Sequence, residues 1–138
     1  MWEMSGYEKI ADMDQSCFLV SMIARTFTNL EREFLEKIAE KLPKDKGERL
    51  RADLSVARVV EDGDFLQVEL TGYKRPDYVG HMNLPFEGKL QDVLGGLVSL
   101  LVNIDQNQRL LELEIIWWDS ESGTILDWST LEIIATPP

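Results

Sequence analysis

The chain has 138 residues and a formal net charge of -11, because it contains 25 acidic and 14 basic residues. This length fits a single domain with an ordinary core, and 44% hydrophobic with 28% charged residues excludes a largely disordered, collagen-like or coiled-coil protein. The acidic excess disfavours sustained binding to nucleic acid or to anionic membranes, which carry the same sign of charge, and favours a basic macromolecule as partner.

Residues 1–24 form an acidic lead-in to the rest of the chain. They lack the basic start and long apolar core of a secretory signal, and no run of about 18 apolar residues is present that would span a membrane. The apolar section 17–23 could be a strand or a first helical turn. Its Cys17 is the single cysteine, so no internal disulfide can form, and we expect a buried thiol in a soluble, cytoplasmic protein.

A helix is predicted to start at Thr28, because Thr28 and Glu31 have the spacing of a capping box. Apolar residues follow at helical spacing until Pro43 stops the run: Leu30, Phe34, Leu35, Ile38 and Leu42. A second, short helix is predicted over 44–54, with Leu50 and Leu54 on its buried side. Charged residues fill the remaining positions and should face solvent.

The pattern changes to that of strands after Ser55. Strands are predicted over 56–60 and 65–71, joined by a tight turn at 61–64 that contains Asp-Gly. Residues 72–96 contain many glycines and prolines, which predicts a long loop, either with a functional role or with a short strand or helical turn inside it. Strands over 97–104 and 109–118 should form a hairpin around a polar turn in which Asn107 can adopt a left-handed conformation. One or two further strand segments, interrupted near Asp127, are expected over 124–134.

These elements predict an α+β fold, with the N-terminal helices packed on one face of an antiparallel sheet of four to six strands. The chain would be a single domain over 1–138, with a helical part at 25–54 and a sheet part at 55–138. Alternation places Leu111, Leu113, Ile115 and Trp117 on one face of the strand 109–118 and Leu110, Glu112, Glu114, Ile116 and Trp118 on the other. The face away from the helices should be wet, and its predicted residues are Gln67, Glu69, Ser99, Asn103, Glu112 and Glu114, with Trp118 and Asp119 at the edge.

Charge is distributed unevenly along the chain. Residues 25–58 contain nine basic and seven acidic side chains, whereas residues 105–138 contain one basic and seven acidic. Acidic side chains beside an exposed tryptophan suit the binding of a basic protein, since carboxylates steer the encounter and the aromatic ring supplies contact area. His81 is the only histidine, and no catalytic, phosphate-binding or metal-binding motif is present, so we expect neither enzyme activity nor a cofactor.

The stretch from Gly88 to Asp119 runs through Asp92-Val93-Leu94-Gly95-Gly96 into a strand and then into Arg109-Leu110-Leu111-Glu112-Leu113-Glu114. It resembles small bacterial domains of unknown function that end in a similar Leu-x-Glu-Leu-Glu strand. Such acidic domains are similar to the immunity proteins of contact-dependent growth inhibition and related polymorphic toxin systems. The resemblance implies binding to a basic cognate toxin, commonly a nuclease, in a 1:1 complex without catalysis.

On this hypothesis the toxin would be occluded by acidic side chains that take the place of substrate phosphates. The partner-binding residues we predict are Asp77, Glu87, Asp92, Glu112, Glu114, Trp118, Asp119 and Glu121. Two alternatives stay open. One is a small-molecule-binding or hydrolytic domain with the loop 72–96 as a lid and Tyr73, Tyr78, His81 and Trp118 lining a pocket. The other is a homodimer that pairs its sheet edges through Leu110, Ile116 and Trp118.

Overall fold

The computed structural model describes residues 24–137 and confirms the α+β fold. Most of the predicted lead-in, including Cys17 and the apolar section 17–23, lies outside the described residues. Two helices precede the sheet, α2 (Asn29–Lys41) and α3 (Lys44–Ser55). The strands follow in this order: β1 (Ala57–Asp62), β2 (Phe65–Leu70), β3 (Met82–Asn83), β4 (Phe86–Asp92), β5 (Leu97–Ile104), β6 (Leu110–Trp117) and β7 (Leu126–Ala135).

The predicted capping box starts α2. The Thr28 hydroxyl accepts a hydrogen bond from the Glu31 amide at 3.1 Å, and the Glu31 carboxylate accepts one from the Thr28 amide at 2.9 Å. Arg25 also pairs with Glu31 at 2.9 Å, so Glu31 is the buried residue of the first turn. Leu30 was predicted to be buried and is 47% exposed, which means that the buried stripe of α2 begins one turn later, at Phe34.

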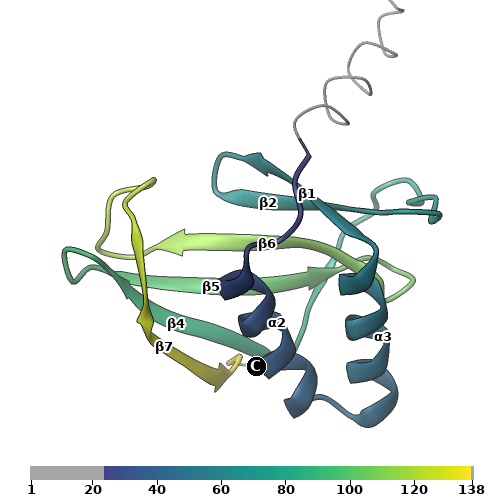
Figure 1. Cartoon of the computed structure of the whole chain (residues 1–138), viewed down its shortest axis with the longest axis horizontal. Coiled ribbons are helices and arrows are strands. Elements are labelled where there is room, and N and C mark those ends of the chain that lie inside the picture. The colour runs from purple at the N-terminus through teal and green to yellow at the C-terminus, as the bar shows by residue number, and fades with distance from the viewer. Residues whose placement is uncertain (1–23, 138) are drawn as a thin grey trace, which may run out of the picture.

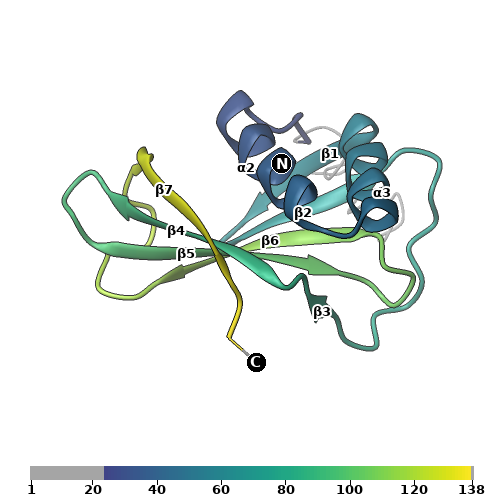
Figure 2. The ribbon, with the colours of Figure 1, turned by 90° about the horizontal axis from the view of Figure 1, so that it is seen from below.

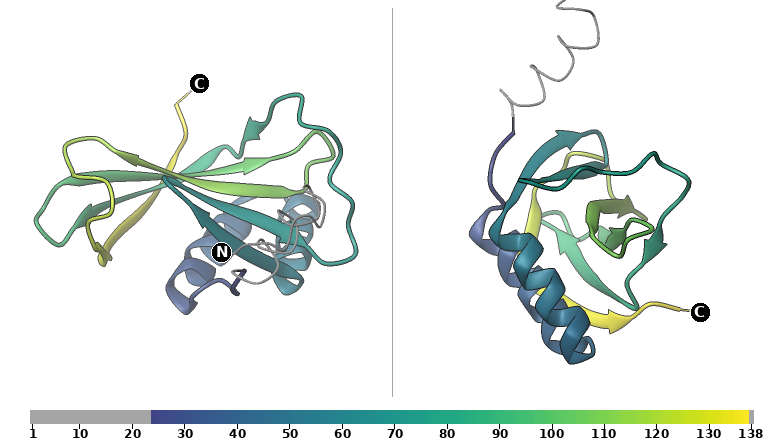
Figure 3. Two further views of the ribbon diagram at one scale, coloured as in Figure 1. Left: turned by 90° about the horizontal axis from the view of Figure 1, so that it is seen from above. Right: turned by 90° about the vertical axis from the view of Figure 1, so that its right-hand side faces the viewer.

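The sheet is antiparallel throughout, with the strand order β1-β2-β6-β5-β4-β7, and the two-residue β3 pairs with β5 beyond the start of β4. Both helices lie on one face of it, as Figures 1 and 2 show. The strands twist strongly, so that β7 crosses the direction of β1 and β2 (Figure 3). Between the helices and the sheet lies one apolar core, to which α2, α3 and all the longer strands contribute.

The predicted long loop at 72–96 is wrong in its second half, where β3 and β4 form. The prediction read Gly88 as a strand breaker, but a Cβ at this position would lie 2.7 Å from the Phe34 ring and 3.0 Å from Leu131. Glycine is therefore the residue that lets α2 approach the sheet closely. Because β4 pairs with both β5 and β7, the sheet has seven strands rather than four to six.

The side-chain facing predicted for the start of β6 is wrong, because a β-bulge lies there. The register with β5 shifts between Asn103 and Ile104, so Leu110 turns into the core and is only 1% exposed. The predicted homodimer contact through Leu110 is therefore excluded by burial. In the turn before β6, Gln108 takes the left-handed conformation, with φ 62°, in place of the predicted Asn107.

Candidate functional site

The face of the sheet away from the helices is not the open, wet surface that we expected. Ser99 and Asn103 are buried, Glu112 and Glu114 are half-buried, and only Gln67 and Glu69 are exposed among the six predicted residues. Ser99 accepts a hydrogen bond from the Trp118 indole and Asn103 accepts one from Asn83 of β3, so this polar face is only partly open to solvent. Alternation identified which side chains share the face, but not how much of it solvent reaches.

Asn103 holds two of the acidic side chains on this face. Its side-chain amide donates to Glu112 at 2.8 Å and to Glu114 at 3.4 Å, and its side-chain carbonyl accepts a hydrogen bond from Asn83. Glu87 lies on the same face and is 7% exposed, and its carboxylate makes no hydrogen bond or ion pair with another residue of the described range 24–137. The two half-buried glutamates are therefore held in place from inside, and Glu87 is too buried to contact a partner directly.

Exposed apolar side chains gather at one end of the sheet. Ten large hydrophobic residues in the described part of the chain are exposed, and five of them come from the β4–β5 turn, the first residue of β5 and the β6–β7 loop. We call these five the end patch: Val93, Leu94, Leu97, Trp118 and Ile125. They are 56%, 85%, 44%, 62% and 72% exposed respectively.

Hydrogen bonds join the two segments that carry the end patch. The Val93 amide donates to the Ile125 carbonyl at 2.9 Å, and the Trp118 amide donates to the Leu97 carbonyl at 3.0 Å. Figures 1 and 2 both show the β4–β5 turn and the β6–β7 loop side by side at this end. The indole of Trp118 donates to the buried Ser99 hydroxyl at 2.8 Å, which fixes the direction of the ring while most of it stays exposed.

Two of the predicted binding residues hold the backbone at this end in place: Asp92, which is buried, and Asp119, which is exposed. Asp92 is buried and accepts hydrogen bonds from the Ser120 hydroxyl and from the amides of Gly96 and Leu94, and these bonds hold its pKa below the ordinary value. A Cβ on Gly96 would lie 2.8 Å from the Asp119 carbonyl oxygen, so only glycine fits this turn. The Asp119 carboxylate in turn accepts from the Leu97 amide.

The surroundings of the end patch are acidic. Residues 90–97 and 117–127 contain four acidic side chains, Asp92, Asp119, Glu121 and Asp127, and no lysine, arginine or histidine. The β1–β2 turn adds Asp64, which accepts hydrogen bonds from Ser122 at 2.7 Å and from the Trp117 indole at 3.0 Å. By contrast, the helices at 29–55 carry seven acidic and seven basic residues and are neutral overall. The acidic excess therefore surrounds the end patch and not the helices.

The other predicted residues do not join this site. Asp77 is exposed on the loop at the opposite end of the sheet, where Tyr78 contacts His81 at 2.9 Å. The four residues of the proposed lidded pocket are not brought together, because Trp118 belongs to the end patch at the other end of the sheet and the Tyr73 hydroxyl is hydrogen-bonded to Asp105 and Asn107. The exposed members of the predicted set at the end patch are Trp118, Asp119 and Glu121.

A buried charged network at the same end of the sheet as Tyr78 and His81 was not predicted from the sequence. Asp105 is 3% exposed and accepts from the Tyr73 hydroxyl at 2.6 Å and from Arg75 at 3.0 Å, and the guanidinium of Arg109 lies 4.3 Å from the centre of the Tyr73 ring. Burial alone would raise the pKa of Asp105, but the hydrogen bonds from Tyr73, Arg75 and the Arg109 amide outweigh it and lower this pKa. For Tyr73, burial and the bond to Asp105 raise the pKa.

A second buried acid, Asp53, connects α3 to β6. It is 2% exposed, pairs with Arg109 at 2.8 Å and accepts the Leu110 amide at 3.0 Å. These networks are closed, since each carboxylate already has its donors, and they serve stability. Within residues 24–137 there is no group of three or more His, Cys, Asp or Glu side chains placed to hold a metal ion.

Comparison of the chain with protein-family models, with curated proteins and with solved structures finds no match. Over residues 24–137, no helix is long and apolar enough to cross a membrane. The end patch and the acidic residues around it are therefore the basis of the proposed function.

Proposed function

We propose that the protein is a cytoplasmic immunity protein that binds a basic toxin domain, such as a nuclease, and blocks its active site. The observation that carries the proposal is the end patch, five exposed apolar side chains on two segments, 90–97 and 117–127, that contain four acidic residues and no basic one. Its chemistry is complementary to a substrate-binding surface rich in lysine and arginine. The stretch 88–119 resembles small bacterial domains of unknown function, and such acidic domains are similar to immunity proteins, which is why we propose a toxin as the basic partner.

Trp118 is the central anchor of the proposed contact. It is a large aromatic side chain that is 62% exposed and already oriented by Ser99, so its binding costs little side-chain entropy. Leu94 and Ile125 add apolar area on either side of the junction of the two loops. Glu121 and Asp119 would meet the basic residues of the toxin and raise the rate of association.

The acidic surroundings argue against the end patch as a homodimer contact. A two-fold contact would bring Asp119, Glu121 and Asp127 of one copy against the same residues of the other, and like charges at an interface cost affinity. A basic partner turns the same charges into attractive pairs. The same apolar area therefore favours a complex with a different protein over self-association.

The proposal is tested by measuring the affinity of the purified toxin partner for matched variants. Trp118→Ala should weaken binding by about 2 kcal/mol or more, roughly 30-fold, as expected for an aromatic anchor. Tyr78→Ala is the matched control, because Tyr78 is an aromatic side chain of similar exposure, 68%, at the opposite end of the sheet. Equal losses in the two variants would contradict the assignment of the surface.

The charge contribution needs its own pair of variants. Glu121→Lys at the end patch should slow association and should remove part of the salt dependence of the rate. Glu48→Lys on α3 makes the same change in net charge at an exposed position away from the end patch. An association rate lowered equally by both variants would mean that only the net charge matters.

A further inference from the structure

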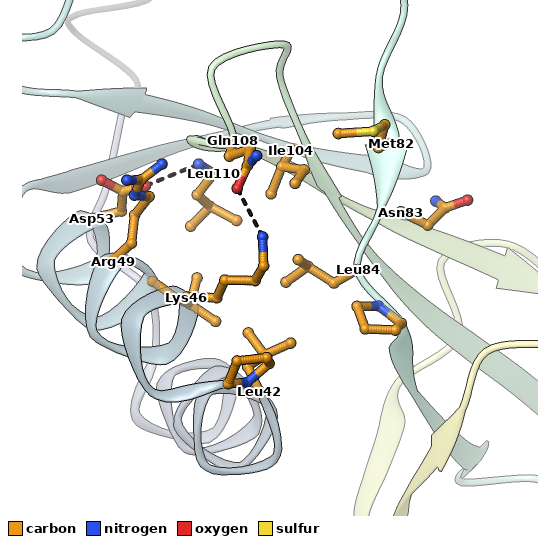
Figure 4. Close-up of a pocket in the computed structure, with 13 residues that line it drawn as sticks. Leu42, Lys46, Arg49, Asp53, Met82, Asn83, Leu84, Ile104, Gln108 and Leu110 are labelled. Carbon is orange, nitrogen blue, oxygen red and sulfur yellow. Dashed lines mark hydrogen bonds between the residues drawn. The ribbon is translucent and has the colours of Figure 1, made fainter.

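A pocket of about 280 Å³ is lined by residues of α3, of β3 and of the β5–β6 hairpin. Figure 2 shows α3 and β3 at the end of the sheet opposite the β4–β5 turn, so the pocket is far from the end patch. Its walls come from three parts of the chain: the α2–α3 junction with α3, the segment Met82 to Pro85, and the β5–β6 hairpin. Figure 4 shows Leu42, Leu84, Ile104 and Leu110 around the pocket, with Lys46 reaching across it. Nothing in the proposed toxin contact uses this pocket.

The inside of the pocket is apolar and rigid. Leu42, Leu50, Leu84 and Leu110 are each at most 7% exposed and belong to the core, so the floor is built from side chains that core packing holds in place. Asp53 also lines the pocket, but its carboxylate is used by Arg109 and by the Leu110 amide. The floor therefore offers apolar contact without a free acidic group.

The rim of the pocket carries two positive charges, Lys46 and Arg49, although the protein as a whole is acidic. Lys46 donates to the Gln108 side chain at 3.0 Å, and Arg49 approaches the Asn107 carbonyl oxygen at 3.5 Å. Neither cation has a carboxylate within ion-pairing distance in the described range 24–137, although the chain carries 25 acidic residues. A neutral amide and a neutral carbonyl are weaker partners for these cations than an anion would be.

From this arrangement we infer that the pocket binds a small amphipathic anion, an aliphatic chain that ends in a carboxylate. The chain would lie on the leucine floor, and the carboxylate would replace Gln108 as the partner of Lys46 and would pair with Arg49. If each methylene needs about the 30 Å³ that a water molecule occupies, the pocket holds about nine such groups. A medium-chain carboxylate such as decanoate matches this size, and such pockets are typically apolar with a few polar groups that orient the ligand.

The experiment titrates the full chain with decanoate and follows both the heat of binding and the NMR signals of the methyl groups. Saturable 1:1 binding is expected, with the largest shifts at Leu84, Leu110 and Ile104. The double variant Lys46→Gln/Arg49→Gln should weaken decanoate by about tenfold or more and leave the binding of decanol nearly unchanged. Lys44→Gln is the matched control, because Lys44 lies on α3 but does not line the pocket.

A variant that fills the pocket separates apolar contact from charge. Ile104→Phe adds volume at a half-buried lining position and should weaken decanoate and decanol alike. Should this variant fail to fold, the comparison of Lys46→Gln/Arg49→Gln with Lys44→Gln and the methyl shifts still test whether decanoate binds in the pocket. The inference is overturned by an absence of saturable binding up to about 1 mM decanoate, by shifts centred on Leu94 and Ile125, or by equal affinity for decyltrimethylammonium.

Discussion

Replacing Asp53 tests how the helices are attached to the sheet. Asp53→Ala removes the ion pair with Arg109 at 2.8 Å and leaves the Leu110 amide without its acceptor at 3.0 Å. An unsatisfied buried amide costs about 1–3 kcal/mol, and breaking a buried ion pair costs about 3–5 kcal/mol in total. Arg109 keeps some solvent contact and its place over the Tyr73 ring, so we expect the low end, about 3 kcal/mol.

Urea unfolding followed by circular dichroism measures this loss. With a slope of about 2 kcal/mol per molar urea, a loss of about 3 kcal/mol lowers the midpoint by about 1.5 M. Glu36→Gln is the control, since it breaks the ion pair of Glu36 with Arg51, whose side chains are 44% and 43% exposed, and an exposed pair contributes less than about 1 kcal/mol. A midpoint for Asp53→Ala no lower than that of the control would refute the role of Asp53.

Three further variants probe other parts of the structure. Gly88→Ala should lower the free energy of unfolding by about 1–3 kcal/mol, because its Cβ would overlap the Phe34 ring. Adding Phe34→Leu to this variant should recover part of the loss. An unchanged urea midpoint for Gly88→Ala would contradict the close approach of α2 to β4. The lowered pKa of Asp105 means that its contribution to stability is present above its unfolded pKa of about 3.9 and is lost as the pH falls through the folded value. Asp105→Asn should therefore be less stable at neutral pH and should lose less stability than the parent on acidification below about pH 4, and parallel acid unfolding curves would argue against this. The pKa of Tyr73 is shifted in the opposite direction, upward, so the contribution of Tyr73 to stability is present below about pH 10 and is lost above it. Tyr73→Phe should therefore lose less stability at alkaline pH than the parent, which thermal unfolding between neutral and alkaline pH would show.

Local patterns in the sequence were sufficient to predict most of the elements. The capping box at Thr28 and Glu31 and the strand conformation of β5 and β6 follow from local residue patterns, and the structure confirms them. β4 was missed because its Gly88 is explained by a helix more than 50 residues earlier in the chain, at Phe34. A glycine that serves close packing cannot be told from a glycine that ends a strand without knowing what lies opposite.

The candidate site was predictable only in part, for a similar reason. Trp118 and Glu121 were identified as surface residues of one strand end, and the structure places them beside the β4–β5 turn. Leu94 and Ile125 were missed, since their exposure follows from two loops meeting at one end of the sheet, a long-range pairing. Asp92 looked like a surface acid, yet its side chain closes a turn, and the sequence around it does not distinguish the two roles.

Binding of a basic protein by the end patch is tested most directly by affinity purification of the tagged protein from its native lysate. The double variant Trp118→Ala/Glu121→Lys and the control Tyr78→Ala/Glu48→Lys are purified in parallel. We expect a basic protein in stoichiometric amount with the parent and with the control, and none with the end-patch variant, while all three proteins unfold at the same temperature. Capture of the same partner by the end-patch variant, or of no protein by the parent, would contradict the proposed function.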